Sequence, residues 1–401
     1  MNAGRVVIVG AGHAGWRTAQ TLRAGGWPGE ITLIGEESGS PYDRTSVSKA
    51  ILFQHAEPKP LGPTDFSYLP GQRVRHIDRA ARQVIIGGTP PVGYDHLVLA
   101  TGARPRHLGL GECALRGVFS LRSATDAAAL RRSLEPGARL VIVGGGLIGL
   151  EVAAGAVRAG LDVTVLEATP RIMARVLPEA ISAALADEHS REGIRILFNV
   201  APVCISCDND LAVTLSSGVK LVADIVLVAI GVTPNSELAV GAGLDVSNGV
   251  VVDATLATPD PTVSAIGDVA YAQHPLFGVP LRLESQQAAE EHGSYVARRL
   301  MGRGSDFRGV PWAWSDQYDK VVQIAGVPAL ASQVVLRDFE DEGLVACHLA
   351  DDGRLLAATG FGNPKLIAQE IGSAKRLIAR SISLEVGALS NPSRALRSLD
   401  V

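Results

Sequence analysis

The chain is poor in cysteine, carries no excess of basic residues and lacks any long hydrophobic run. Its 401 residues include 4 cysteines, too few and too scattered for a disulfide framework or for an iron–sulfur site with four thiolate ligands. The 37 lysines and arginines stand against 41 acidic residues, a net charge of −4 that argues against a nucleic-acid partner. The longest apolar runs, such as residues 225–232, fall well short of the roughly 20 residues that a membrane-spanning helix needs. We therefore expect neither a nucleic-acid nor a membrane partner.

The first apolar segment, residues 5–9, begins too near the N-terminus to leave room for a signal peptide. Together with the low cysteine content, this predicts a cytoplasmic protein. His13 has no plausible metal partner, and we expect no metal site. A chain of this length exceeds one ordinary core and, at about 150 residues per domain, predicts two or three domains.

Two glycine-rich loops of the same design lie far apart in the chain. Each has the spacing G-x-G-x-x-G, with Gly10, Gly12 and Gly15 in the first loop and Gly144, Gly146 and Gly149 in the second. Each loop follows an apolar segment typical of a strand and opens a segment with helical spacing. The first glycine permits a tight turn, the second lets the backbone approach a pyrophosphate, and the third lets helix and strand pack closely.

An acidic residue completes each unit. Glu36 and Glu167 end the next apolar segment, about 20 residues after their loops, where a carboxylate binds a ribose 2′-hydroxyl. Two complete units of this kind predict paired nucleotide cofactors.

The order of the segments predicts an α/β fold with two doubly wound domains. Segments 94–102 and 224–235 are closing strands that repeat between the halves, and from about residue 310 an alternating pattern and a helix over 364–379 indicate a separate α+β domain. The predicted domains are 1–112 with 243–309, then 113–242, and finally 310–401.

Several motifs resemble those of the FAD-dependent, NADH-oxidising ferredoxin reductases of bacterial monooxygenases and dioxygenases. They are residues 41–44 leading to Ser48 and Lys49, and residues 100–102, 265–268, 282–285 and 311–318. The resemblance implies a glutathione-reductase-like fold, with FAD in the first domain and NADH in the second. It also implies that electrons pass from NADH through FAD to a two-iron ferredoxin, in a monomer or weak homodimer.

The same resemblance implies the site residues. FAD would contact Gly10, Gly12, Ala14, Gly15, Glu36, Arg44, Lys49, Val74, Ala100, Thr101, Gly102, Arg122, Gly267, Asp268 and Gln286. NADH would contact Gly144, Gly146, Ile148, Gly149 and Glu167. Because a carboxylate at Glu167 repels a 2′-phosphate, NADH is favoured over NADPH, although the nearby Arg171 offers that phosphate a partner.

Lys49, Glu151 and Trp314 are the expected catalytic residues. The resemblance brings Lys49 and Trp314 to the flavin, where a cation favours the reduced ring. A purely structural ion pair of Lys49 with Glu151 is the alternative. The loop 44–49 lacks two prolines that the family carries, which loosens the segment before Lys49.

Other interpretations remain open from the sequence. Cys204 and Cys207 have the spacing of a redox disulfide but follow the second loop, and a pair of small strand residues is the simpler interpretation. A rubredoxin or thiol-linked oxidoreductase, or a redox sensor resembling apoptosis-inducing factor, would share the fold. Three cations could favour an acidic partner or simply form a solvated helix face: Lys375, Arg376 and Arg380.

Overall fold

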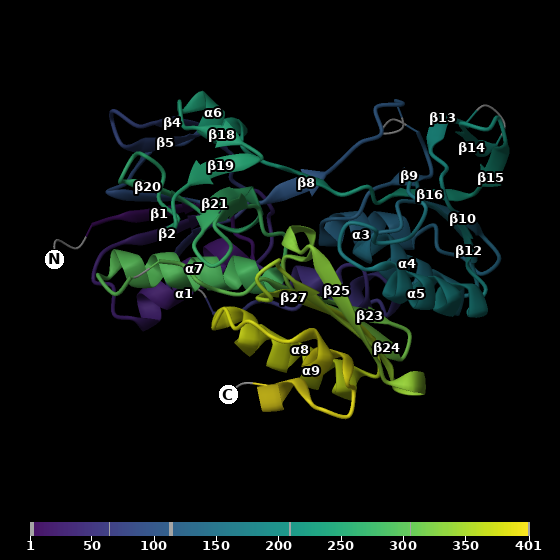
Figure 1. Cartoon of the computed structure of the whole chain (residues 1–401). Helices are drawn as coiled ribbons and strands as arrows, with labels where there is room; N and C mark the ends of the chain where they lie inside the picture. Colours follow the sequence, from purple (N-terminus) through teal and green to yellow (C-terminus); the bar gives the residue numbers. More distant parts are fainter. Residues whose placement is uncertain (1–3, 64, 112–114, 208–209, 305, 400–401) are drawn as a thin grey trace. The chain divides into compact units, whose positions relative to one another are not determined.

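The computed structural model describes residues 4–63, 65–111, 115–207, 210–304 and 306–399. These residues form two compact units, each built from separated stretches of chain (Figure 1). Unit 1 comprises residues 1–44, 58–104 and 233–311, and unit 2 comprises residues 45–57, 105–232 and 312–401. The strands β8 (Ala103–Pro105) and β17 (Val232–Pro234) carry the chain from one unit to the other.

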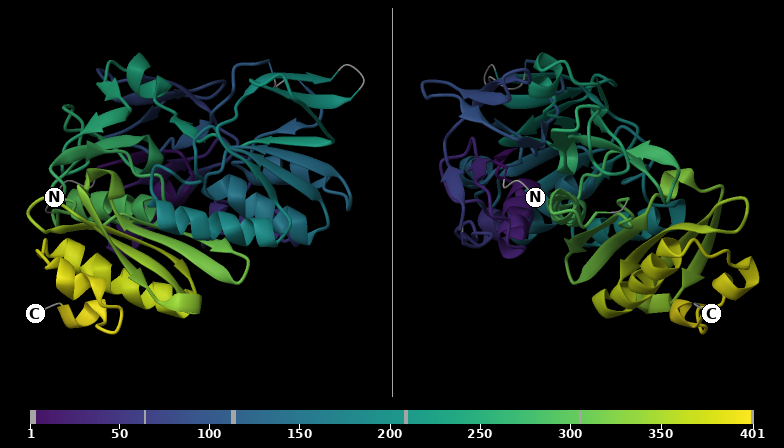
Figure 2. Two further views of the ribbon diagram at one scale, coloured as in Figure 1. Left: turned by 45° about the vertical axis from the view of Figure 1, so that its right-hand side comes forward. Right: turned by 90° about the vertical axis from the view of Figure 1, so that its left-hand side faces the viewer.

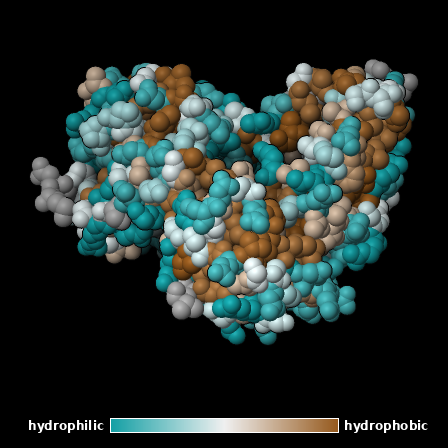
Figure 3. All heavy atoms as spheres, viewed as in Figure 1, coloured by the Kyte–Doolittle hydropathy of each residue, from teal (hydrophilic) through white to brown (hydrophobic). Residues whose placement is uncertain are grey.

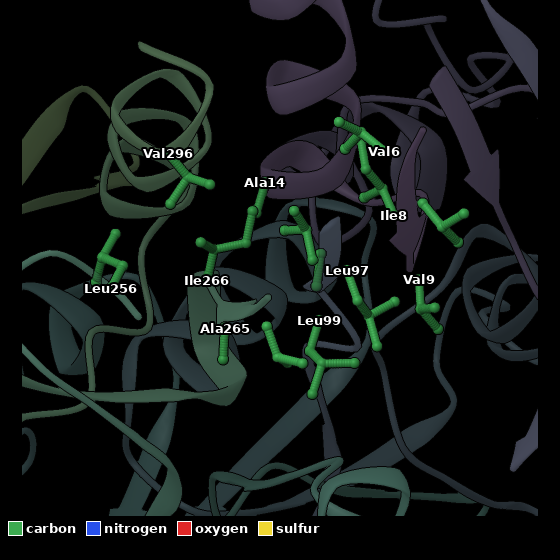
Figure 4. Packing of buried hydrophobic residues seen from close by; sticks show 14 of the residues in the cluster. Val6, Ile8, Val9, Ala14, Leu97, Leu99, Leu256, Ala265, Ile266 and Val296 are labelled. Carbon is green, nitrogen blue, oxygen red and sulfur yellow. The ribbon is translucent and has the colours of Figure 1, made fainter. Parts of the chain in front are cut away.

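Unit 1 is organised around a five-stranded parallel sheet with the order β20-β7-β1-β2-β3. Its strands are β1 (Val6–Val9), β2 (Ile31–Ile34), β3 (Ser67–Leu69), β7 (His96–Leu99) and β20 (Val263–Ala265). The helices α1 (His13–Ala24) and α7 (Gln286–Leu300) lie side by side. Apolar residues of β1 and β7 pack with Ala14 of α1 and Val296 of α7 in one hydrophobic core (Figure 4).

Two smaller sheets and a short helix complete unit 1. One sheet is antiparallel, with β4 (Val74–Asp78), β5 (Gln83–Ile86) and β6 (Val92–Gly93). The other contains β18 (Val246–Ser247), β19 (Gly249–Val252), β21 (Ala270–His274) and β22 (Val279–Leu281). The helix is α6 (Glu237–Gly241).

Unit 2 repeats the parallel arrangement with the order β12-β11-β10-β16-β9. Its strands are β9 (Val118–Phe119), β10 (Arg139–Val143), β11 (Asp162–Leu166), β12 (Arg195–Leu197) and β16 (Ile225–Val228). Its helices are α2 (Ala50–Phe53), α3 (Ala124–Arg131), α4 (Leu147–Arg158) and α5 (Glu179–Arg191). An antiparallel insertion contains β13 (Pro202–Cys207), β14 (Leu211–Leu215) and β15 (Lys220–Ala223).

The C-terminal part of unit 2 is an antiparallel sheet with the order β23-β24-β27-β26-β25. Its strands are β23 (Trp312–Gln317), β24 (Lys320–Gly326), β25 (Gln333–Asp338), β26 (Gly343–Leu349) and β27 (Leu355–Gly362). The helix α8 (Pro364–Ala379) packs on one face, with α9 (Val386–Ser390) near β25 (Figure 2). Hydrophobic side chains gather over the edge strand β25, where Val334 is 48% exposed and Leu336 39% (Figure 3).

The predicted fold class is confirmed, because two parallel sheets each follow the strand, loop, helix order and an α+β part follows them. The three-domain division stays a prediction. Its boundary between residues 112 and 113 lies outside the described residues, and the contacts of the chain group residues 312–401 with 105–232.

Candidate functional site

The first glycine loop leaves the N-terminus of α1 open. The helix begins after Gly12, and no side chain of the described residues caps it or places a negative charge in its first turn. Gly10 has a left-handed φ of 111°. A Cβ on Gly15 would lie 1.9 Å from the carbonyl oxygen of Gly10, whereas one on Gly12 would lie no nearer than 3.8 Å to the Arg44 guanidinium. Free N–H groups, a close backbone and a nearby cation fit a pyrophosphate.

The second loop repeats this geometry in unit 2. Gly146 precedes α4 and, over the part of the chain that the structure describes, that helix also has no side-chain cap. Gly144 has a φ of 113°, and a Cβ on Gly149 would lie 2.2 Å from the carbonyl oxygen of Gly144. A Cβ on Gly146 would meet nothing within 4 Å, so space remains beside the helix N-terminus. Ile148 in the first turn is 44% exposed. This loop too has the shape that a dinucleotide needs.

The Glu167 carboxylate binds the second glycine loop, whereas the Arg171 side chain binds backbone carbonyls. The Glu167 carboxylate accepts hydrogen bonds from the backbone N–H of Gly145 at 2.9 Å and of Thr169 at 2.8 Å. The Arg171 guanidinium instead donates to the backbone carbonyls of Ala174 and Leu177. The group offered at the end of β11 is therefore a carboxylate, which suits an unphosphorylated ribose.

The corresponding groups of unit 1 are more varied in their surroundings. Glu36 is exposed and lies 3.4 Å from Arg73 in a surface ion pair. Val74 begins β4 and is buried at 6% exposure. Arg44 pairs with Glu37, and its guanidinium lies 5.1 Å from the centre of the Tyr42 ring.

The turn after β7 is held by Asn235. The Asn235 side chain donates to the Thr101 carbonyl at 2.9 Å, and the Thr101 hydroxyl donates to the Asn235 carbonyl at 2.7 Å. The Asn235 backbone N–H also donates to the carbonyl of Gly102, whose φ is 67°. Ala100 is buried beneath the turn, where its carbonyl oxygen would meet a Cβ on Gly10 at 2.1 Å.

The turn at Gly267 and Asp268 is anchored by a buried histidine. The Gly267 N–H donates to Nδ1 of His292 at 3.1 Å. Burial lowers the pKa of His292 to about 3, so the imidazole stays neutral and its Nδ1 remains an acceptor. Gln286, the first residue of α7, donates through its side chain to Glu290 at 2.9 Å.

Arg122 lies in unit 2, immediately before the N-terminus of α3. Its backbone N–H donates to Asp126 at 3.0 Å, next to the capping box that Ser123 and Asp126 form. The Arg122 position is thereby fixed by a helix cap.

Lys49 and Glu151 form an ion pair in unit 2, with their nitrogen and oxygen 3.4 Å apart. Asp316 lies 2.7 Å from the same ammonium. Glu151 is buried at 8% exposure and accepts from Ser48 at 2.5 Å and from Ser315 at 2.6 Å. Burial lowers the pKa of Lys49, but Glu151 and Asp316 outweigh it and raise the pKa above its usual value. Lys49 is thus held as a cation.

Trp314 extends this cluster along β23. Its ring stacks on Trp312 with centroids 4.8 Å apart, and the Lys49 ammonium lies 6.0 Å from the Trp314 ring. The Lys375 ammonium lies 5.7 Å from the centre of the Trp312 ring. Each ring of the tryptophan pair therefore has a lysine ammonium within about 6 Å, the range of a cation–π contact.

The structure adds residues that the sequence analysis missed. Ser48, Ser315 and Asp316 surround the Lys49–Glu151 pair, and Asn235 and His292 hold two turns expected to touch FAD. Ser48, Ser315 and Asp316 were visible only as parts of the family motifs. Hydroxyl and amide side chains carry no spacing signal of their own, so single-sequence patterns could not assign them roles.

The cysteines and possible metal ligands offer no competing centre among the described residues. Cys204 and Cys207 are exposed free thiols on β13. Within the described ranges, no three His, Cys, Asp or Glu side chains gather as a metal site, and no helix has the length and apolarity to cross a membrane.

Comparisons with known proteins agree with this geometry. A family model described as pyridine nucleotide-disulphide oxidoreductase matches residues 4–293, and one described as reductase C-terminal matches residues 312–400. Rhodocoxin reductase from Rhodococcus erythropolis is 39% identical over 94% of this chain and 90% of its own. The ferredoxin–NAD(+) reductase component of the anthranilate 1,2-dioxygenase system of Burkholderia cepacia is 36% identical over 99% of this chain and 100% of its own.

A solved structure is also similar to this chain. The crystal structure of a covalent putidaredoxin reductase–putidaredoxin complex matches with a TM-score of 0.93 and 34% identity, over 99% of this chain and 98% of the matched one. The chain therefore belongs to the pyridine nucleotide-disulphide oxidoreductase family and, within it, to the flavoprotein ferredoxin reductases that use FAD and NADH.

Proposed function

We propose that this protein passes electrons from NADH through FAD to a two-iron ferredoxin that serves a monooxygenase or dioxygenase. The observation that carries the proposal is the pair of open helix N-termini, one in each unit, in a chain whose relatives are ferredoxin reductases of oxygenase systems. When bound, FAD accepts a hydride from NADH and releases its electrons singly. The overall reaction balances as one NADH and two oxidised ferredoxins giving one NAD⁺, two reduced ferredoxins and one proton.

The residues of unit 1 are proposed to hold FAD. The N–H groups at the start of α1 and the Arg44 cation would neutralise the pyrophosphate, and Glu36 would bind the adenosine ribose. The remaining contacts that the family resemblance implies are Gly10, Gly12, Ala14, Gly15, Val74, Ala100, Thr101, Gly102, Arg122, Gly267, Asp268 and Gln286. The firm seating of two of these turns by Asn235 and His292 supports a site built before the cofactor binds.

The residues of α4 and its loop are proposed to bind NADH: Gly144, Gly146, Ile148, Gly149 and Glu167. Glu167 would select the ribose 2′-hydroxyl. The hydrogen bonds of Arg171 to backbone carbonyls support this selectivity, because the arginine that the sequence offered as a 2′-phosphate partner is engaged elsewhere.

Lys49, Glu151 and Trp314 are proposed as the catalytic residues. A lysine held as a cation would stabilise negative charge on the flavin ring, and Glu151 with Asp316 would hold that lysine in place. Trp314, with Lys375 and Arg376 of α8 and with Arg380 directly after that helix, would form the surface on which an acidic ferredoxin docks. The Lys375 ammonium over Trp312 supports this placement of the cations.

We further propose three domains, with FAD in 1–112 and 243–309, NADH in 113–242 and an α+β domain over 310–401. The protein would act in the cytoplasm as a monomer or weak homodimer, a state that light scattering with and without NADH can measure. Free thiols at Cys204 and Cys207 support the reducing compartment.

Stopped-flow spectroscopy of the FAD-loaded protein tests the function. NADH should bleach the oxidised flavin faster than NADPH does, and an added two-iron ferredoxin should then restore the flavin colour while two ferredoxins are reduced per NADH. A reduced flavin that ferredoxin leaves unchanged would contradict the proposal, and a faster reaction with NADPH would contradict the role of Glu167.

A further inference from the structure

The turn that follows β20 has a buried backbone N–H whose acceptor is a side chain. The Ile266 N–H donates to the Leu99 carbonyl at 2.9 Å and continues the pairing of β20 with β7. Gly267 comes next, is buried and has a left-handed φ of 68°. Its N–H donates to Nδ1 of His292 on α7 at 3.1 Å. A buried N–H needs an acceptor, and here α7 supplies it.

The His292 ring has no other hydrogen bond among the described residues. It is 1% exposed, and its Nε2 is buried without a hydrogen-bond partner in those ranges. The ring meets Phe307 edge to face, with centroids 4.6 Å apart and planes at 89°. Because Nδ1 accepts from Gly267, the neutral ring carries its proton on the unpaired Nε2. An apolar side chain would avoid that unpaired donor, so the acceptor at Nδ1 is what a histidine contributes here.

The residue after His292 brings α7 against the first glycine loop. A Cβ on Gly293 would lie 2.4 Å from the carbonyl oxygen of Ala14, so the backbones of α7 and α1 are in direct contact there. The same Ala14 carbonyl accepts from the Thr18 hydroxyl at 2.9 Å. Consecutive residues of α7 therefore contact two separate turns, His292 the turn at Gly267 and Gly293 the first glycine loop.

The two turns also lie against each other. A Cβ on Gly267 would lie 3.0 Å from the Cβ of Ala14 and 3.7 Å from the Cβ of Ala289 on α7. Ile266, directly before the turn, belongs to the same hydrophobic core as Ala14 (Figure 4). A shift of the Gly267 turn would therefore change its spacing from the first glycine loop, and both are proposed to contact FAD.

We propose that His292 is a positioning residue of the FAD site, which holds the Gly267–Asp268 turn at the spacing from the first glycine loop that FAD needs. Without the acceptor, the turn of the empty protein would relax until the Gly267 N–H meets water. FAD binding would then have to reverse that shift and bury an unpaired N–H. This role rests on the proposed FAD site of unit 1.

His292→Leu tests the role, because leucine fills most of the space of the imidazole and offers no acceptor. Dilution of the FAD-loaded protein, followed by the fluorescence of the released flavin, measures the FAD dissociation constant. It should rise roughly tenfold, as expected for one unpaired backbone N–H. The affinity of unit 2 for NAD⁺, measured by calorimetry with FAD in excess, should not change.

His292→Asn separates positioning from packing. The asparagine side-chain oxygen can accept in place of Nδ1, although asparagine fills less of the space beside Phe307 than leucine does. This variant should unfold at a lower temperature than the wild type and still hold FAD nearly as tightly. Packing alone predicts the opposite order, with FAD weaker in His292→Asn than in His292→Leu, and that order would overturn the proposal.

His274→Leu is the matched control. His274 is 2% exposed and contacts the same Phe307 ring, with centroids 5.7 Å apart, but its Nε2 donates to the Gly309 carbonyl at 3.0 Å rather than accepting from Gly267. Its replacement should lower stability about as much as His292→Leu does and leave the FAD dissociation constant unchanged. An equal loss of FAD affinity in both leucine variants would contradict a specific role of His292.

Hydrogen exchange in the wild-type protein covers the case in which His292→Leu does not fold. After FAD is removed, the Gly267 N–H should stay protected, and exchange at the rate of an exposed amide would overturn the proposal. A wild-type protein that holds no FAD would contradict the proposed function and this role with it. FAD held equally by the wild type and by His292→Leu would contradict the role of His292 alone.

Discussion

At the scale of single residues, the proposed role of Glu167 is to select NADH over NADPH. Glu167→Ala should raise KM for NADH roughly tenfold, as expected for loss of a hydrogen bond to a charged group, and should reduce the discrimination against NADPH. Steady-state kinetics with both cofactors measures the change. Arg171→Gln is the control. The Arg171 guanidinium bonds backbone carbonyls of its own loop, so its loss should leave the ratio of kcat/KM for NADH to kcat/KM for NADPH unchanged. A control variant that loses NADPH turnover selectively would show that Arg171 contacts phosphate.

Lys49→Met separates a tuning role from a structural ion pair. If Lys49 tunes the flavin, its loss should lower the flavin midpoint potential, by about 30 mV for each 1.4 kcal/mol of lost stabilisation, and slow reduction by NADH at least tenfold. Stability should change little, since Ser48 and Ser315 still satisfy the Glu151 oxygens. Potentiometry and urea unfolding decide the matter. An unchanged potential with a large loss of stability would establish the structural alternative.

Residues with a spacing signal could be predicted, and those that only satisfy hydrogen bonds could not. The glycines and Glu167 follow from sequence because backbone approach and charge restrict each position to one residue type. Ser48 and Ser315 lack such a signal, since serine occurs in many environments. The loop before Lys49 lacks prolines, yet it forms a helical turn over Arg44–Ser46. The Lys49 N–H then donates to the Ser46 carbonyl at 3.1 Å, which holds the loop in place.

At the scale of elements, Gly146 and Gly149 of the second glycine loop differ in the space around them. Gly149→Ala would bring a Cβ to 2.2 Å from a carbonyl oxygen, so the loop must shift and stability should fall. Gly146→Ala has free space in the protein, so its stability should be nearly unchanged. Its methyl would instead occupy the space proposed for the pyrophosphate, and NADH affinity should fall at least tenfold. Thermal unfolding and NADH titration together distinguish the two; normal NADH affinity in Gly146→Ala would contradict the proposed binding mode.

The periodic segments were predicted closely. The expected helix over 364–379 is α8, and the first apolar segment, residues 5–9, contains β1. The helix α7 begins at Gln286, because Ser285 caps it and accepts from the Ala288 N–H. Strands of two or three residues, such as β9, escaped prediction because so short a stretch has no period to detect.

At the scale of the whole molecule, buried neutral histidines should make the protein acid-sensitive. Burial lowers the pKa of His96, His189 and His348 to about 4 from the usual 6.5. Unfolding therefore takes up protons below pH 6.5, so stability is complete above that value and falls as the pH drops toward 4. Each histidine contributes a slope of about 1.4 kcal/mol per pH unit.

Urea unfolding between pH 7 and 4.5 measures this slope. His348→Asn should make it shallower, whereas His55→Asn, at an exposed position with a left-handed φ of 55°, should leave it unchanged. Stability that rises on acidification would contradict the assignment of neutral histidines.

The grouping of distant segments could not be predicted from local patterns. Residues 45–57 belong with unit 2, although both neighbouring stretches belong with unit 1. No linker-like composition marks either end of this segment in the sequence. Its grouping with unit 2 depends instead on long-range contacts, such as that of the Phe53 ring with Gly155 on α4.

The interleaving of the two units has a consequence for biosynthesis. The parallel sheet of unit 1 lacks its edge strand β20 until residue 265 has been made, and unit 2 lacks the complete sheet β23–β27 until residue 362 has been made. Neither unit can finish folding while the ribosome is still translating the middle of the message. Nascent chains arrested after residue 232 should therefore remain protease-sensitive and depend on chaperones, whereas release of the full polypeptide lets both units close together.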